Sequence, residues 1–227
     1  MKYYVRALIC IAVLLGIVCT VKDYYDTKTV NPNDIGFEIN NNVQPWNLIL
    51  INKTNEMTDS LLPDLVTTEN GEKIAQNVYF HLEELFRAAE EAGFSPELTS
   101  GYRSRNQQED IFDDRINEYR ELGYSKKEAT SLTNNYAARP GYSEHETGLA
   151  ADINSADGDS RKLYEWLKDN AYRYGFILRY PASKTDVTGI IYEPWHYRYV
   201  GKELAAELHD LDMCLEEYLL MLTDTVG

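Results

Sequence analysis

Two of the four histidines in this chain lie in short, dense clusters of polar side chains. His145 follows Ser143, with Asp152 seven residues further on, and His196 closes a short run that begins at Glu193. Imidazole nitrogens and carboxylate oxygens are usual ligands of a catalytic zinc ion, which takes three protein ligands and keeps one position open for water. The sequence therefore predicts a zinc site formed by His145, Asp152 and His196.

A run of small and apolar residues, 147–151, joins the first two candidate ligands. It suits a buried strand that carries Asp152 back toward His145. A carboxylate left unpaired in such a place loses several kcal/mol of hydration or raises its pKa, so it needs a cationic partner. The run therefore indicates a metal ion or an arginine beside Asp152.

Glu193 is the candidate general base, because hydrolysis of an amide needs a group that takes a proton from the attacking water and passes it to the leaving amine. In a regular strand, Glu193 and His196 would point to opposite faces. We therefore expect a bulge or turn at Pro194 that aims both side chains toward the metal. A regular strand through 193–196 would count against this hypothesis.

The motifs SxHxxGxAxD at 143–152, ExWH at 193–196 and SGYRS at 100–104, the last with Gln108, resemble in order and spacing those of VanY-type zinc D-alanyl-D-alanine carboxypeptidases. The resemblance covers roughly residues 46–210. The stretches 174–181 and 188–201 are also similar to the branch of the family that is linked to glycopeptide resistance. VanX and VanXY dipeptidases and hedgehog-type domains are related to this family.

The resemblance implies a role for each residue that matches a motif. His145, Asp152 and His196 would hold the zinc ion and Glu193 would be the base. Arg103 would stabilise the polarised scissile carbonyl and the developing oxyanion, as a guanidinium can where negative charge develops. The substrate would be held by a further set of residues: Gln108, Ser143 and Trp195. Trp195 suits packing that positions His196 better than it suits a reactant.

The function that this predicts is removal of the terminal D-Ala from peptidoglycan precursors that end in D-Ala-D-Ala. An L,D-carboxypeptidase or a peptidoglycan endopeptidase would use the same ligands and base, so both stay open. A non-catalytic, zinc-containing wall-binding module is a further alternative, but such a module needs neither Glu193 nor Arg103. No S-x-x-K nucleophile motif occurs, so the predicted peptidase is serine-independent.

Length and composition agree with a single enzyme domain. The chain has 227 residues, of which 44% are hydrophobic and 26% charged, as in a soluble fold with one well-buried core. Its net charge of −15 repels the phosphate backbone, so nucleic acid is excluded as a partner. An anionic substrate group would need a local cation, for which Arg103 is the candidate.

The N-terminus carries an export or anchoring signal. Lys2 and Arg6 precede an uncharged apolar run at 7–21, and Lys22 closes it. No small-x-small cleavage site follows, which favours an uncleaved membrane anchor over a signal peptide at 1–22, and the basic flank places the rest of the chain outside the cell membrane. Secretion is the alternative. Residues 23–45 then read as a polar linker, and 46–227 as the zinc-peptidase domain.

The expected fold is α+β, with a central, largely antiparallel sheet flanked by helices. Apolar spacings of three and four predict a helix over 72–92. Capping boxes at Ser104 and Ser125 predict helices that run to about 121 and 136. Further helices are expected at 160–173 and, as a pair, within 201–223. The strand candidates are 48–51, 97–100, 149–154, 175–179 and 188–199.

Overall fold

A computed structural model of the chain describes residues 45–226. The predicted membrane anchor at 1–22 and nearly all of the predicted linker at 23–45 lie outside the described residues, and the domain start at residue 46 stays a prediction. Over residues 45–226, no helix is both long enough and apolar enough to cross a membrane.

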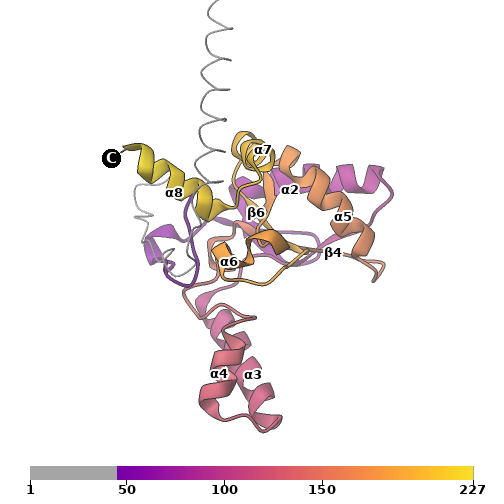
Figure 1. Cartoon of the computed structure of the whole chain (residues 1–227). Helices are drawn as coiled ribbons and strands as arrows, with labels where there is room; N and C mark the ends of the chain where they lie inside the picture. Colours follow the sequence, from indigo (N-terminus) through magenta and orange to yellow (C-terminus); the bar gives the residue numbers. More distant parts are fainter. Residues whose placement is uncertain (1–44, 227) are drawn as a thin grey trace, which may run out of the picture. The chain divides into compact units, whose positions relative to one another are not determined.

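The described residues form an α+β domain (Figure 1). Its strands are β1 Leu65–Thr67, β2 Lys73–Ala75, β3 Pro96–Ser100, β4 Ala150–Ser155, β5 Phe176–Leu178 and β6 His196–Tyr199. Its α-helices are α2 Gln76–Glu91, α3 Arg105–Glu121, α4 Lys126–Thr133, α5 Arg161–Asn170, α6 Thr185–Thr188, α7 Lys202–Leu211 and α8 Leu215–Val226. Short 3-10 turns are η2 Asp59–Leu61, η3 Glu144–Thr147, η4 Ala171–Tyr174 and η5 Ala182–Lys184.

The main sheet has the strand order β3-β4-β6-β5, and each neighbouring pair is antiparallel. A separate two-stranded sheet is formed by β1 and β2. The predicted α+β class and antiparallel sheet are thus confirmed.

The central strand β6 shows why this sheet has one apolar and one polar face. Side chains alternate along a strand, so Tyr197 and Tyr199 point into the main core, whereas His196 and Arg198 point to the other face. The register brings Asp152 of β4 directly opposite His196. The polar face of the sheet is therefore the place where the candidate ligands meet.

Helices cover the apolar face and one end of the polar face. The main core is filled by the inward side chains of the sheet together with those of α2 and α5: Val78, Leu82, Leu85, Leu98, Ala151, Ile153, Leu163, Leu167 and Phe176. A second cluster joins Ile177 of β5 to α7 and α8 through Ala205, Leu208, Leu215 and Leu219. The hairpin of α3 and α4 has a small core of its own, made of Phe112, Ile116 and Ala129.

Capping residues fix the helix boundaries that the sequence indicated. The side chains of Ser104 and Ser125 each accept a hydrogen bond from the backbone N–H of the third helical residue. The side chain of that third residue accepts a hydrogen bond from the backbone N–H of the serine, so both predicted capping boxes are confirmed. Gly93, at φ +88°, follows the end of α2. The pair of C-terminal helices breaks at Asp212, which adopts a left-handed conformation with φ 50°.

Residues 49–51 of the apolar segment 48–51 are buried, but the strand predicted there is absent from the described structure. Leu50 and Ile51 are fully buried, and no ladder pairs this segment with another strand. Instead, the carbonyl of Ile49 accepts a hydrogen bond from Arg198 Nη2 at 2.7 Å. A side chain thus satisfies the buried backbone group that a neighbouring strand would otherwise satisfy.

Three other predicted elements are shorter than expected. The helix predicted from residue 72 begins at Gln76, because residues 73–75 pair with β1 as the strand β2. The strand predicted over 188–199 is reduced to β6, because Thr188 ends α6 and the chain turns at 194–195. α4 likewise ends at Thr133, short of 136.

Candidate active site

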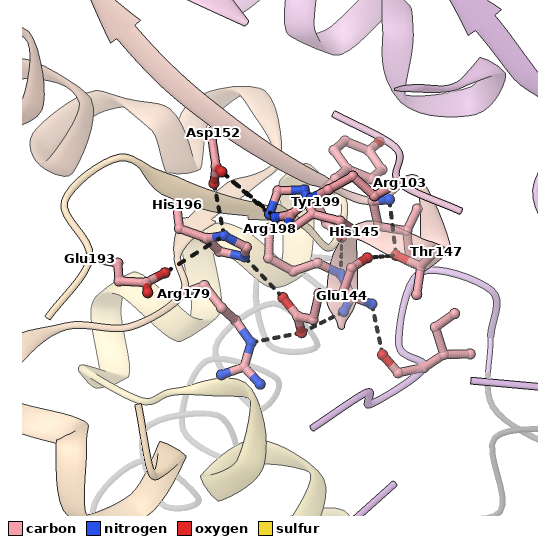
Figure 2. A network of polar contacts seen from close by, with 12 residues as sticks. Arg103, Glu144, His145, Thr147, Asp152, Arg179, Glu193, His196, Arg198 and Tyr199 are labelled. Carbon is pink, nitrogen blue, oxygen red and sulfur yellow. Dashed lines mark hydrogen bonds and ion pairs between the residues drawn. The ribbon is translucent and has the colours of Figure 1, made fainter. Parts of the chain in front are cut away.

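The pairing of β4 with β6 holds Asp152 beside His196. Their backbones are register partners, and Asp152 Oδ1 lies 2.9 Å from His196 Nδ1 (Figure 2). The His196 ring is also packed against Tyr180, with 4.9 Å between ring centroids. Strand register and packing therefore fix one nitrogen of His196 toward the carboxylate.

His145 reaches the same place from the short turn η3. Its Nδ1 lies 2.7 Å from the carbonyl oxygen of Gly101, so Nδ1 donates to that carbonyl and Nε2 is left to face Asp152, with 3.4 Å between Nε2 and Oδ2. A Cβ at Gly101 would lie 2.0 Å from the carbonyl oxygen of Lys73. Only glycine fits at this crossing, which explains the glycine of the SGYRS motif.

These three side chains fit a zinc ion. One donor atom from each of His145, Asp152 and His196 lies within 4.8 Å of the others. Ligand atoms at about 2.1 Å from a tetrahedral zinc are separated by roughly 3.4 Å, close to the contacts of 2.9 and 3.4 Å within this set. The donors that face one another are His145 Nε2, the Asp152 carboxylate and His196 Nδ1.

The protonation states of the three candidate ligands differ. Burial raises the pKa of Asp152, but the adjacent histidines outweigh burial and hold that pKa well below its ordinary value. Burial lowers the pKa of His145. Burial also opposes the charge on His196, yet its hydrogen bonds to Asp152 and Glu144 raise its pKa to about 9. Before a metal ion binds, a proton on His196 therefore supplies the positive charge beside Asp152.

Glu193 enters the cleft from a turn. The backbone N–H of His196 donates to the Glu193 carbonyl at 3.2 Å across residues 194–195, so the predicted turn at Pro194 is confirmed. Glu193 Oε2 lies 3.9 Å from His196 Nδ1. Burial raises the pKa of Glu193 above that of an ordinary glutamate, which suits a group that accepts and returns a proton.

Arg103 also approaches Asp152, at the oxygen that His145 faces, and is oriented by Gln108. Arg103 Nη2 is 4.0 Å from Asp152 Oδ2, and its Nη1 donates to Gln108 Oε1 at 2.9 Å. The other end of the amide donates to the carbonyl of Ala138 at 2.7 Å. Gln108 is therefore engaged at both ends of its amide and supports Arg103; its predicted direct contact with substrate stays a prediction.

The other two predicted substrate-binding residues also line the cleft that contains the candidate ligands. Ser143 is 4% exposed and precedes η3, whereas Trp195 is half-buried within the turn after Glu193. The far wall of this cleft comes from the α3–α4 hairpin and the chain that follows it, through Ile111, Arg115 and Tyr136. All eight predicted site residues are thus brought to one cleft, while their chemical roles stay predictions.

Four charged residues behind the cleft were missed by the sequence reasoning. They are Glu144, Arg179, Arg198 and Glu216, each at most 2% exposed. Glu144 Oε1 accepts hydrogen bonds from Arg179 and Arg198, both at 2.8 Å, and Glu216 binds Arg179 through two bonds of 2.6 and 2.8 Å. Burial raises the pKa of Glu144, but the two guanidinium groups outweigh burial and hold it well below its ordinary value.

One sequence signal could have found this buried network. Arg198 lies between two tyrosines in a short strand, and Arg179 directly follows the apolar residues of β5. A charged residue in a buried strand needs a partner. Glu144 could not have been chosen as that partner from sequence, because nothing there distinguishes it from the many exposed acidic residues.

Comparison with known proteins relates this arrangement to one protein family. The sequence profile of the VanY family, described as D-alanyl-D-alanine carboxypeptidase, matches residues 71–202. A D-alanyl-D-alanine carboxypeptidase of Enterococcus faecalis is 44% identical over 179 residues, covering 78% of this chain and 66% of the relative. Three of the curated relatives are covered to 58%, 61% and 66% of their own lengths, under two thirds in each case.

Solved structures give the same picture. The D,D-pentapeptidase VanY of a VanB-type resistance cassette, solved with Zn(II), has a TM-score of 0.74 and 42% identity, over 77% of this chain and 99% of that one. A second VanYB structure, with the same TM-score and identity, contains D-alanine-D-alanine. The LD-carboxypeptidase LdcB has a TM-score of 0.64 and 35% identity, over 80% of this chain and 88% of its own.

Proposed function

The chain belongs to the VanY family of D-alanyl-D-alanine carboxypeptidases, and on that premise we propose that it is a zinc metallopeptidase that removes the terminal D-Ala from peptidoglycan precursors ending in D-Ala-D-Ala. One observation carries the proposal. A three-residue donor set, a glutamate with a raised pKa and a guanidinium converge on one cleft. A binding module would need the donor set alone.

His145, Asp152 and His196 would hold the zinc ion. When bound, zinc supplies a Lewis acid that polarises the scissile carbonyl and lowers the pKa of the attacking water. The rest of the chemistry falls to the side chains around it. Glu193 accepts a proton from the attacking water at its carboxylate and passes that proton to the leaving amine of D-Ala.

Arg103 stabilises the negative charge that develops on the substrate. Its guanidinium lies 4.0 Å from Asp152 Oδ2, the oxygen that His145 also faces, and is oriented by Gln108 before any substrate arrives. A donor fixed in advance stabilises a developing oxyanion without the cost of reorganisation. Arg103 is also the nearby cation that a substrate oxygen requires in a chain with a net charge of −15.

Cleavage of an L,D bond is the second candidate activity. It is favoured by the similarity to LdcB, which is named an LD-carboxypeptidase. The higher identity to the VanY D,D-pentapeptidase, 42% against 35%, supports the D,D assignment. That similarity also suggests a link to glycopeptide resistance.

The test is D-Ala release by the full chain from two peptides. One is a pentapeptide ending in Lys-D-Ala-D-Ala, and the other is the tetrapeptide ending in Lys-D-Ala. We expect zinc-dependent release from the pentapeptide that stops on chelation and returns with zinc. Release from the tetrapeptide alone would replace the D,D assignment with the L,D activity, and cleavage only in whole sacculi would assign an endopeptidase.

The place of action is also part of the proposal. The basic and apolar N-terminal segment supports a single membrane anchor at 1–22, a linker at 23–45 and a domain outside the cell membrane, where its substrate lies. Protease added to intact protoplasts should then digest the domain. Protection of the domain would contradict an external location, and its release into the medium would indicate secretion.

A further inference from the structure

Glu144 lies directly behind one of the candidate metal ligands, His196, and contacts it through one oxygen. Its Oε2 is 3.5 Å from His196 Nε2, while the other ring nitrogen of His196 faces Asp152 (Figure 2). A metal-ligating histidine typically donates its second N–H to a carboxylate or carbonyl, which fixes the tautomer and orients the ring. The carbonyl of Gly101 has this position for His145, and Glu144 has it for His196.

Two guanidinium groups fix the Glu144 carboxylate. Arg179 and Arg198 both donate to Oε1 at 2.8 Å, which leaves Oε2 directed at the His196 ring. Arg198 is itself fixed, because its Nη2 donates to the carbonyl of Ile49 at 2.7 Å. All three charged side chains are fully buried, so no solvent competes for these contacts.

Helix α8 completes the support. Its Glu216 binds Arg179 through both terminal nitrogens, at 2.8 and 2.6 Å, a two-point geometry that restricts rotation of the guanidinium. The two carboxylates and two guanidinium groups balance in charge. A chain of direct contacts thus runs from Glu216 through Arg179 and Glu144 to His196.

We propose that Glu144 is a positioning residue of the metal site. Held by Arg179 and Arg198, it fixes the His196 ring so that Nδ1 faces the metal position. Glu216 extends this support to the C-terminal helix. This proposal rests on the proposed function for the identity of the metal, zinc. It goes beyond that function because it makes Glu144 a determinant of how tightly and in which geometry the metal is bound.

The test is Glu144→Gln in the full chain, with zinc affinity measured by competition against a chromophoric chelator. Glutamine keeps the size of the side chain and an acceptor oxygen but removes the charge. Zinc affinity should fall by about 10–100-fold, the usual effect of losing a partner of a metal-bound histidine. The visible spectrum of the cobalt(II)-loaded variant should also change, because a reoriented ring alters the ligand field.

The matched control is Glu217→Gln, in the residue that follows Glu216 on α8. Glu217 pairs with the half-buried Lys184 at 3.0 Å. This variant should keep the zinc affinity and cobalt spectrum of the wild type. A folded Glu144→Gln variant with the affinity and spectrum of the wild type would overturn the proposal, because a merely structural residue changes stability without changing metal binding by the folded protein.

If Glu144→Gln does not fold, a charge-balanced double variant can be compared with a single variant instead. Arg198→Gln combined with Glu144→Gln removes one positive and one negative charge together, whereas Arg198→Gln alone retains Glu144. The double variant should bind zinc more weakly than the single variant, and equal affinities would overturn the proposal. Zinc binding by a wild type that releases no D-Ala would defeat the proposed function without affecting this comparison.

Discussion

Two groups of charged residues share the polar face of the main sheet, and they differ in how their charges are balanced. The group behind the cleft contains Glu144, Glu216, Arg179 and Arg198, all at most 1% exposed in their side chains. Two carboxylates meet two guanidinium groups. This network is complete without any ligand.

The group in the cleft is balanced differently. The guanidinium of Arg103 acts on both Asp152 and Glu193, and a further positive charge is a proton on His196. A proton can be exchanged for a metal ion, whereas a guanidinium cannot. The buried network therefore supports the fold around the site, whereas the cleft keeps one positive charge that a metal ion can replace.

The largest expected effect comes from removing one permanent charge from the buried network. Arg179→Met leaves Glu144 and Glu216 without their shared cation, so the free energy of unfolding should fall by about 3–5 kcal/mol, as when a buried ion pair loses one partner. That is a large part of a typical total of about 5–15 kcal/mol. Denaturant unfolding of the full chain measures the change.

Arg161→Met is the control for this substitution. Arg161 is 87% exposed and pairs with Asp159 at the start of α5, so its loss should leave stability nearly unchanged. An equal loss in the free energy of unfolding for both substitutions would contradict the claim that the buried network stabilises the fold more than an exposed ion pair does.

A smaller free-energy effect is expected from Arg103, which belongs to the cleft. Arg103→Met should lower kcat for D-Ala release by about 10²–10³-fold, as when one donor to a developing oxyanion is lost. Zinc affinity should change little, because Arg103 supplies no ligand. Arg115→Met on the wall of the same cleft should lose much less. An effect of Arg103→Met confined to KM would assign it to substrate binding alone.

The smallest effect is the release of a proton, which tests directly whether zinc replaces the positive charge on His196. The pKa of His196 is raised to about 9, so below that pH the ring is protonated and zinc must displace a proton to bind. His145, whose pKa is lowered, releases none. Apparent zinc affinity should therefore rise as pH increases toward 9 and then level off. Calorimetry in buffers of different ionisation enthalpy should detect about one proton released per zinc at pH 7.5, and no release would contradict this picture.

The sequence was sufficient for the features that local physics determines. The two capping boxes, the break between α7 and α8 and the antiparallel sheet were all predicted correctly. The conformation of the segment 48–51 was not predicted correctly, because a buried loop and a buried strand give the same apolar pattern. What distinguishes them here is the long-range bond from Arg198 to the carbonyl of Ile49, 149 residues away.

The cleft residues could be predicted because the motifs give their types and spacing, and the turn at Pro194 followed from the need to aim Glu193 and His196 together. The buried network could not, because its partners lie on η3, β6, α8 and the residue after β5. No spacing in the sequence relates these segments. Only the folded sheet brings their charges together.

The most direct test of the account is a comparison of Glu193→Gln with the wild type, both loaded with one equivalent of zinc. In the proposed mechanism, His145, Asp152 and His196 bind the metal, and Glu193 transfers the proton. This mechanism therefore predicts unchanged zinc binding but release of D-Ala from the pentapeptide slowed by about 10²–10⁴-fold, the usual contribution of a general base. Release at the rate of the wild type by the zinc-loaded variant would contradict the account.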